Sequence, residues 1–245
     1  MALSPELVSK TSGKLWAFVL RHPWSIGLSV LAATCFVKLA SEVREGELGA
    51  VDAALTMFVI GYRGRFDPLM LALTYVGGGL GMTLLATLVC LSCWLCQRRT
   101  EAVFVAVAGI GTGAINSGLK LFFQRARPDA DLLYLIGTPG SFSFPSGHAM
   151  GSAGVLASVV VVLYAVGLPR RLRVPVAMLA SAFALGVAVS RVYFGVHYPS
   201  DLLGGQFAAA AWVSAVTGVF YPRLLPGERA TPKTHDAVVE VSEQR

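Results

Sequence analysis

Six long apolar runs constrain the possible fold of this chain more than any other feature of its sequence. They lie at about 24–40, 80–96, 102–123, 147–168, 174–193 and 199–221. Each run approaches the roughly 20 residues that an α-helix needs to cross a bilayer. Hydrophobic residues make up 55% of the chain and charged residues only 14%, which is more apolar than a soluble domain requires. We therefore predict an all-α, polytopic membrane protein with six transmembrane helices.

The other segments divide the chain around this six-span domain, which we place at 24–221. Residues 1–23 are polar and basic and lack the apolar core and cleavage site of a signal peptide. Residues 41–78 are mostly too polar to cross a bilayer, so we predict an exposed outer segment with short amphipathic helices. Residues 222–245 are polar and contain proline, which is typical of a mobile tail.

The distribution of lysine and arginine predicts which way the helices face, because cytoplasmic loops carry an excess of both. With six spans, the two termini and the loops after spans two and four share one side. That side carries Lys10, Lys14, Arg21, Arg98, Arg99, Arg170, Arg171, Arg173, Arg223, Arg229, Lys233 and Arg245. The opposite side carries Lys38, Arg44, Arg63, Arg65, Lys120, Arg125, Arg127 and Arg191. We therefore predict an inner (plasma) membrane protein with cytoplasmic termini and an outward-facing active site, on the periplasmic or extracellular face.

Two other classes of protein fit the sequence less well. The net charge of +6 could attract nucleic acid, but the basic residues lie in short clusters between apolar runs without an aromatic and basic binding surface. Cys90, Cys93 and Cys96 have the spacing CxxCxxC, yet they lie in an apolar run and no fourth ligand follows. We expect no nucleic-acid partner, and we interpret the cysteines as small buried residues.

Three polar stretches carry ionisable residues at the ends of predicted spans. They are KLFFQRARP at 120–128, SFPSGHA at 143–149 and SRVYFGVHYPSD at 190–201. Ionisable groups beside spanning segments are costly to desolvate, so each is a hypothesis of function. Because spans three and five run outward and spans four and six begin there, we expect the three stretches to meet at one membrane surface.

The meeting of these stretches predicts a site for a phosphate group. Lys120, Arg127 and Arg191 would supply three cations, and arginine favours bidentate contact with phosphate oxygens. Ser146 can cap the fourth span and leave N–H groups of its first turn free for an anion. Each cation alone could be a snorkelling interface residue, and a Pro-Ser-Gly string is an ordinary helix start. Their convergence favours the phosphate site.

Two histidines and an aspartate predict catalysis at that site. His197 and Asp201 are four residues apart, so Asp201 could accept the Nδ1 proton of His197 and leave Nε2 as a nucleophile. His148 could then protonate the leaving oxygen as a general acid. The alternative for Asp201 is a carboxylate that stabilises a helix N-terminus.

These stretches resemble the three signature motifs of the type 2 phosphatidic acid phosphatase superfamily. The matching patterns are K, six residues, RP at 120–128; PSGH at 145–148; and SR, five residues, H, three residues, D at 190–201. The resemblance implies a phosphatase that needs neither metal nor cofactor, in which His197 forms a phosphohistidine, Asp201 orients it and His148 protonates the departing lipid. It also implies that the phosphoryl oxygens are bound by Lys120, Arg127, Ser146, Gly147 and Arg191.

The expected substrate is a lipid phosphate or diphosphate, and among these we favour undecaprenyl diphosphate because the site is predicted to face outward. A phosphatidylglycerophosphate or phosphatidate phosphatase is an alternative. So is a phosphotransferase that passes the phosphoryl group to a second lipid such as lipid A. A protein of another class, a non-catalytic binder of anionic lipids, is disfavoured by the intact histidines and aspartate. Arg125 has no role in the motifs, and a contact with the lipid head group is a hypothesis.

Overall fold

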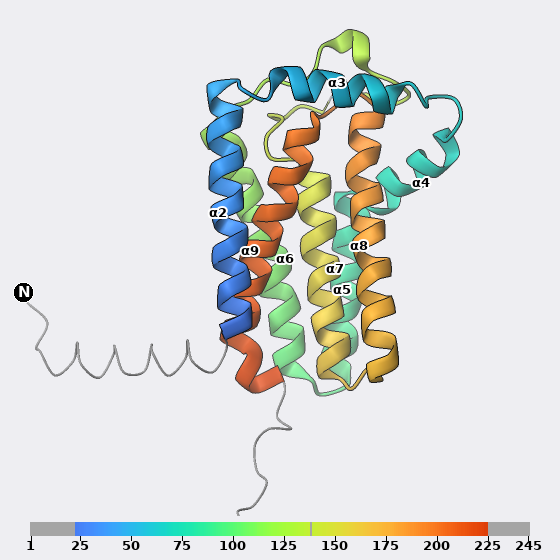
Figure 1. Cartoon of the computed structure of the whole chain (residues 1–245). Helices are drawn as coiled ribbons and strands as arrows, with labels where there is room; N and C mark the ends of the chain where they lie inside the picture. Colours follow the sequence, from blue (N-terminus) through green and yellow to red (C-terminus); the bar gives the residue numbers. More distant parts are fainter. Residues whose placement is uncertain (1–22, 138, 225–245) are drawn as a thin grey trace, which may run out of the picture.

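The chain forms a bundle of upright helices with one helix lying across an end (Figure 1). The computed structural model describes residues 23–137 and 139–224. Its elements are α2 (Pro23–Glu45), α3 (Gly49–Ile60), α4 (Asp67–Val76), α5 (Gly79–Leu95), α6 (Arg99–Phe123), the 3-10 helix η1 (Ala130–Leu132), α7 (Gly147–Ala165), α8 (Arg170–Tyr193) and α9 (Pro199–Leu224). The described residues contain no strand. The predicted all-α class is confirmed.

The structure contains five to six candidate membrane spans, where six were predicted. Within residues 23–137 and 139–224, five helices are long and apolar enough to cross a membrane, namely α2, α6, α7, α8 and α9. Helices α4 and α5 pass the same test only together, and they are bent by 50° at a short break. Counted as one span, this bent pair gives a sixth span that is broken, with the run at 67–76 as its first part.

The limits of the predicted segments differ from those of the helices. Helix α2 continues to Glu45, so five residues of the predicted outer segment extend the first span. Residues 1–22 and 225–245 lie outside the described part of the chain, and the predictions for the N-terminal segment and the tail remain predictions.

The break between α4 and α5 is formed by glycines that pack directly on neighbouring helices. A Cβ atom on Gly77 would lie 2.1 Å from the side chain of Val187, and one on Gly78 would lie 3.2 Å from Nε2 of His148. Larger residues would separate the break from α8 and from the first turn of α7. These glycines therefore serve close packing.

Helix α9 lies inside the bundle, against α2, α6 and α7 (Figure 1). Its Trp212 packs on α6 where a Cβ atom on Gly111 would come within 2.2 Å of the indole ring. The indole N–H donates to the carbonyl oxygen of Ala108 at 3.1 Å. Close approach at a small residue and one interhelical hydrogen bond thus fix α9 to α6.

The loops at the end crossed by α3 are held by a polar cluster around Arg63 and Asp67. Arg63 donates to the carbonyl oxygens of Tyr193 at 2.8 Å and Leu132 at 2.7 Å. Asp67 accepts hydrogen bonds from the hydroxyls of Tyr134 and Tyr193. These contacts tie the segment between α6 and α7 to the end of α8.

The turn after α8 requires a glycine. Gly195 has φ +73°, and a Cβ atom there would lie 1.8 Å from the carbonyl oxygen of Leu132. Only glycine combines this left-handed conformation with such a close approach. The turn presents His197, two residues later, towards the start of α9.

Candidate active site

The eight residues predicted for the site all lie at the end of the bundle that α3 crosses. Lys120 is in the last turn of α6 and Arg127 follows that helix. Ser146 is the N-cap of α7, and Gly147 and His148 begin it. Arg191 is in the last turn of α8, His197 is in the turn that follows, and Asp201 is in the first turn of α9.

A buried carboxylate holds one nitrogen of the His197 ring. His197 is 2% exposed and Asp201 is 0% exposed. Nδ1 of His197 lies 3.2 Å from Oδ2 of Asp201. The same oxygen accepts hydrogen bonds from the backbone N–H of Tyr198 at 2.9 Å and from the hydroxyl of Ser143. The orientation of the imidazole is therefore fixed by a carboxylate that is itself held by two further donors.

The other nitrogen of His197 faces a cation. Nη1 of Arg127 lies 3.2 Å from Nε2 of His197. Since a guanidinium can only donate, the network assigns the proton to Nδ1 and leaves a lone pair on Nε2. This is the tautomer that a nucleophilic histidine needs.

The surroundings of His197 also keep its ring neutral. Burial lowers the pKa of His197 from 6.5 to about 4. Asp201 opposes this shift, whereas the positive charges of Arg127 and Lys120 add to it. A neutral imidazole with its Nε2 lone pair free of a proton is available across the physiological pH range.

The cations of the site are held by neutral oxygen atoms. Nζ of Lys120 donates to the carbonyl oxygen of Phe142, and Arg191 donates to the hydroxyl of Thr74. Arg127 donates to the carbonyl oxygens of Ser141 and Val196 at 2.7 and 2.6 Å.

Within the described part of the chain, none of these three cations forms an ion pair with a carboxylate. Their positive charge is left without a neutralising partner, which favours the binding of an anion between them.

The start of α7 is fixed to both neighbouring helices. Ser146 caps the helix through its hydroxyl, which accepts from the N–H of Ala149 at 3.5 Å, and its own N–H donates to the carbonyl oxygen of Asp201 at 3.0 Å. Asn116 of α6 donates to the carbonyl oxygen of Pro145 at 3.2 Å. The N-terminus of α7, with its anion-binding N–H groups, is thereby held beside the His197 and Asp201 pair.

His148 completes the group on the α7 side. Its ring packs against Gly78 at the break between α4 and α5. It lies within electrostatic range of Arg191, His197, Arg127 and Lys120. The second histidine therefore lies in the first turn of α7, at the same end of the bundle as the other predicted site residues.

Sequence reasoning missed two residues of this network and left a third without a role. Ser143 bridges His197 and Asp201, and Asp52 of α3 is a buried carboxylate paired with Arg125. Arg125 also pairs with Asp201, so its guanidinium contacts two acids of the protein, and a contact with the lipid head group remains a prediction. A lone acid within the apolar run GAVDAALTMFVI was the signal that could have indicated Asp52.

An apolar groove leads from this site into the bundle. It has a volume of about 520 Å³ and lies between α5, α6 and α7. Its lining includes Gly147 and Asn116 at the site and Val105 and Cys90 near the far end. Gly113 and Gly151 also line it, and Cβ atoms at these two positions would meet nothing within 4 Å.

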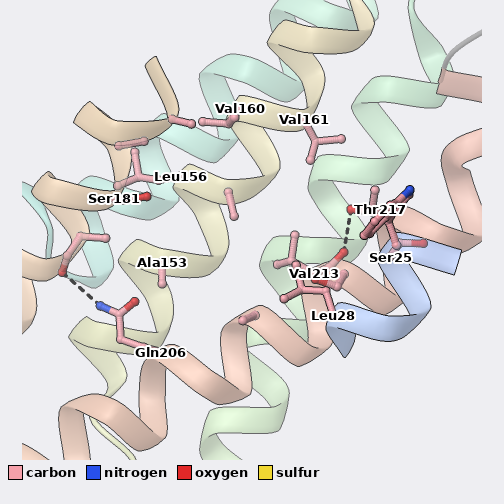
Figure 2. Close-up of a pocket in the computed structure, with 17 residues that line it drawn as sticks. Ser25, Leu28, Ala153, Leu156, Val160, Val161, Ser181, Gln206, Val213 and Thr217 are labelled. Carbon is pink, nitrogen blue, oxygen red and sulfur yellow. Dashed lines mark hydrogen bonds between the residues drawn. The ribbon is translucent and has the colours of Figure 1, made fainter. Parts of the chain in front are cut away.

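A second cavity, of about 610 Å³, lies between α2, α7, α8 and α9 (Figure 2). Its lining is mainly aliphatic, with Gln206 and Ser181 among the few polar residues, and none of the eight predicted site residues lines it. It is therefore not part of the candidate site. Among the residues that the structure describes, no group of three or more His, Cys, Asp or Glu side chains could hold a metal ion.

The chain is similar to a known family and to several known proteins. The family described as the PAP2 superfamily matches residues 101–224. Phosphatidylglycerophosphatase B of Bacillus subtilis (strain 168) is 28% identical over 174 residues, which cover 69% of this chain and 83% of that protein. Undecaprenyl-diphosphatase BcrC of the same strain is 30% identical over 127 residues, which cover 50% of this chain and 61% of that protein.

One solved structure is similar over most of the chain. The crystal structure of a transmembrane PAP2-type phosphatidylglycerolphosphate phosphatase from Bacillus subtilis has a TM-score of 0.70 and 26% sequence identity. The similarity covers 78% of this chain and 95% of that one.

We predict that the His197 ring titrates near pH 4, because burial lowers its pKa. An NMR titration of the histidine ring resonances in detergent micelles measures this value, and the spectrum of a His197→Gln variant assigns the signal. At about pH 5.5 the signal should still have its neutral position, where an ordinary histidine is mostly protonated. A midpoint near 6.5 would contradict the buried, neutral imidazole.

The same shift affects the stability of the fold in a known direction. The unfolded chain binds this proton more tightly than the folded protein, so the stabilising effect of neutral His197 is complete above about pH 6.5 and is lost as the pH falls towards 4. Thermal unfolding recorded at each pH of the titration identifies the range in which the protein remains folded.

Proposed function

The chain belongs to the PAP2 superfamily and is a membrane phosphatase of that family. We propose that it releases phosphate from a membrane lipid through a phosphohistidine on His197. The observation that carries the proposal is the pair of contacts on this ring. Asp201 lies 3.2 Å from Nδ1, and Arg127 lies 3.2 Å from Nε2. A phosphoryl oxygen bound by Arg127 would therefore lie next to the free lone pair.

In the first step, the Nε2 lone pair forms a bond to phosphorus, and the bond between phosphorus and the lipid oxygen breaks with its electron pair. His148, protonated by the approach of the anionic substrate, donates its proton to that oxygen. The phosphorylated ring carries a positive charge, and Asp201 stabilises it through the Nδ1–H hydrogen bond.

In the second step, water attacks phosphorus and the bond to Nε2 breaks. His148 accepts a proton from the water, so both histidines return to their starting states and inorganic phosphate is released. The electrophilic role that a metal has in other phosphatases falls to the cations and to the N-terminus of α7.

The phosphoryl group would bind to the three cations that form no ion pair with a carboxylate. Lys120, Arg127 and Arg191 would exchange their neutral oxygen partners for phosphoryl oxygens, which accept stronger, charge-assisted hydrogen bonds. Ser146 and Gly147 would contribute the helix N-terminus, where glycine permits close approach of the anion to the backbone. A Cβ atom on Gly147 would lie 3.1 Å from Oδ1 of Asn116, so the position is tightly packed.

The groove between α5, α6 and α7 supports a lipid as the substrate. It is mainly apolar, it lies among membrane-spanning helices and it reaches Gly147. We propose that the hydrocarbon chain nearest the phosphate lies in this groove while the phosphate binds among the cations.

For the identity of the lipid, we propose undecaprenyl diphosphate or phosphatidylglycerophosphate. The first follows from the proposed outward orientation and from the relative named for that diphosphate. The second is favoured by the relative and the solved structure named for phosphatidylglycerophosphate, which the chain covers over 83% and 95% of their lengths. The proposed location is the inner (plasma) membrane, with cytoplasmic termini and the site at its outer face.

We predict that His197→Ala lowers phosphate release from the purified protein in detergent by roughly 10³-fold or more, because it removes the nucleophile. Cys96→Ala serves as the control and should keep full activity, because Cys96 is exposed, contrary to the burial predicted from the sequence, and lies at the end of α5 away from the site. Release at the wild-type rate by His197→Ala would refute the phosphohistidine mechanism.

The same assay ranks the substrates. Turnover is compared for undecaprenyl diphosphate, phosphatidylglycerophosphate, phosphatidate and lipid A, each without an acceptor lipid. Phosphate release under these conditions is the result expected of a hydrolase. Turnover that appears only when a second lipid is added would identify a phosphotransferase, and binding of all four lipids without turnover would identify a non-catalytic binder.

We predict that Gly113→Leu raises KM several-fold for a long-chain substrate but much less for a short-chain, water-soluble analogue, because the added side chain enters the groove. Gly118→Leu is a matched control on the same helix, since a Cβ atom there also meets nothing within 4 Å and the residue does not line the groove. An equal effect of the two variants on KM would argue against a hydrocarbon chain in this groove.

A further inference from the structure

Arg125 is the cation near the site that neither the sequence motifs nor the proposed reaction uses. Its side chain is only 18% exposed, although it lies in the polar segment after α6. Nη1 lies 2.6 Å from Oδ1 of Asp201, and Nη2 lies 2.7 Å from Oδ2 of Asp52. The guanidinium is thus shared between two buried carboxylates, one on α9 and one on α3.

The contacts around this guanidinium form a closed network. Asp52 also accepts hydrogen bonds from the backbone N–H of Ser200 at 2.9 Å and from its hydroxyl at 2.6 Å. Arg125 donates to that hydroxyl at 2.7 Å and lies over the ring of Tyr198, with 4.3 Å between Cζ and the ring centre. Tyr198 and Ser200 stand on either side of the first residue of α9, so the network holds the segment that directly follows His197.

The two oxygens of the Asp201 carboxylate have different partners. Oδ2 faces His197, Ser143 and the N–H of Tyr198, whereas Oδ1 accepts from Arg125. If the Asp201 carboxylate rotated, Oδ1 would lose its contact with the charged Arg125 and Oδ2 would lose its contacts with neutral donors. The two terminal nitrogens of one planar guanidinium reach Asp201 and Asp52 at the same time, so Asp52 fixes the direction from which Arg125 holds Oδ1.

We propose that Arg125 and Asp52 are positioning residues for the reaction. Asp52 of α3 holds Arg125 against Asp201, and Arg125 in turn fixes the orientation of the Asp201 carboxylate that orients His197. Helix α3 therefore belongs to the active site. The proposal rests on the phosphohistidine function of His197 proposed above. It gives the outer segment around α3 a role in the reaction that the sequence did not indicate.

Charge supports the arrangement. Burial lowers the pKa of Arg125, but Asp201 and Asp52 outweigh burial and raise it. The guanidinium therefore stays charged, and the carboxylate of Asp201 is partnered by a permanent cation as well as by the imidazole. Removal of Arg125 would leave two buried acids without their common counter-ion, which is a large local change.

The test compares Arg125→Ala and Asp52→Asn with the wild type in steady-state kinetics and in the rate at which His197 is phosphorylated in a single turnover. We expect kcat and the phosphorylation rate to fall by roughly 10- to 100-fold, in the range seen when partners that orient a functional side chain are removed. KM should change little, because neither residue touches the substrate. Arg98→Ala, which breaks an ion pair with Glu101 on α6, is the matched control and should leave both rates unchanged.

A double-mutant comparison separates positioning from general destabilisation. If Arg125 acts through Asp201, then Arg125→Ala should add little to the loss caused by Asp201→Asn. Arg125→Lys should recover only part of the rate, because an ammonium cannot bridge both carboxylates. Asp52→Asn preserves shape and leaves the Arg125 and Asp201 contact in place, so it tests α3 even if Arg125→Ala folds poorly.

Two results would overturn the proposal. One is a rise in KM at unchanged kcat in Arg125→Ala, which would assign Arg125 to the lipid head group. The other is a loss of rate in the Arg125→Ala, Asp201→Asn double variant that equals the product of the two single losses. Failure of the proposed function is distinguishable from both, because the wild type itself would then form no phosphohistidine.

Discussion

The burial of one carboxylate determines the arrangement of this end of the molecule. Asp201 is 0% exposed, and a buried charge is tolerated only when partners replace the water it has lost. Those partners come from different parts of the chain: Arg125 after α6, Ser143 before α7, and His197 with the N–H of Tyr198 before α9. Satisfying this carboxylate therefore draws the ends of three membrane helices together, and Arg125 brings α3 to the same point.

The site combines this satisfied acid with cations that are not neutralised. The negative charge of Asp201 is matched by Arg125, whereas Lys120, Arg127 and Arg191 form no ion pair with a carboxylate in the described residues and contact neutral groups. A net positive surface beside a neutral imidazole suits an anionic substrate attacked by nitrogen. Because the Asp201 and Arg125 pair is separate from the other three cations, the site can bind phosphate with those cations and orient His197 with the pair.

The residues at helix ends were predictable from the sequence because apolar runs fix where helices end and topology fixes which ends meet. Lys120, Arg127, Ser146, His148, Arg191, His197 and Asp201 could all be assigned to one end of the bundle on that basis. Gly147 followed from its place after the cap.

The partners of these residues were not predictable in the same way. Asp52 and Ser200 are separated by 148 residues along the chain, and no periodicity connects an acid on an outer helix with the start of the last span. The bend between α4 and α5 and the groove beside Gly147 depend equally on packing between helices, which a single sequence does not specify.

In the proposed reaction, cations and a helix N-terminus hold a phosphate against Nε2 of His197. The most direct test is an experimental structure of the protein with orthovanadate, which imitates phosphorus under attack. We expect a bond between vanadium and Nε2, with the vanadate oxygens on Lys120, Arg127, Arg191 and the N–H groups at the start of α7. Vanadate bound away from His197, with Nε2 still facing Arg127, would contradict it.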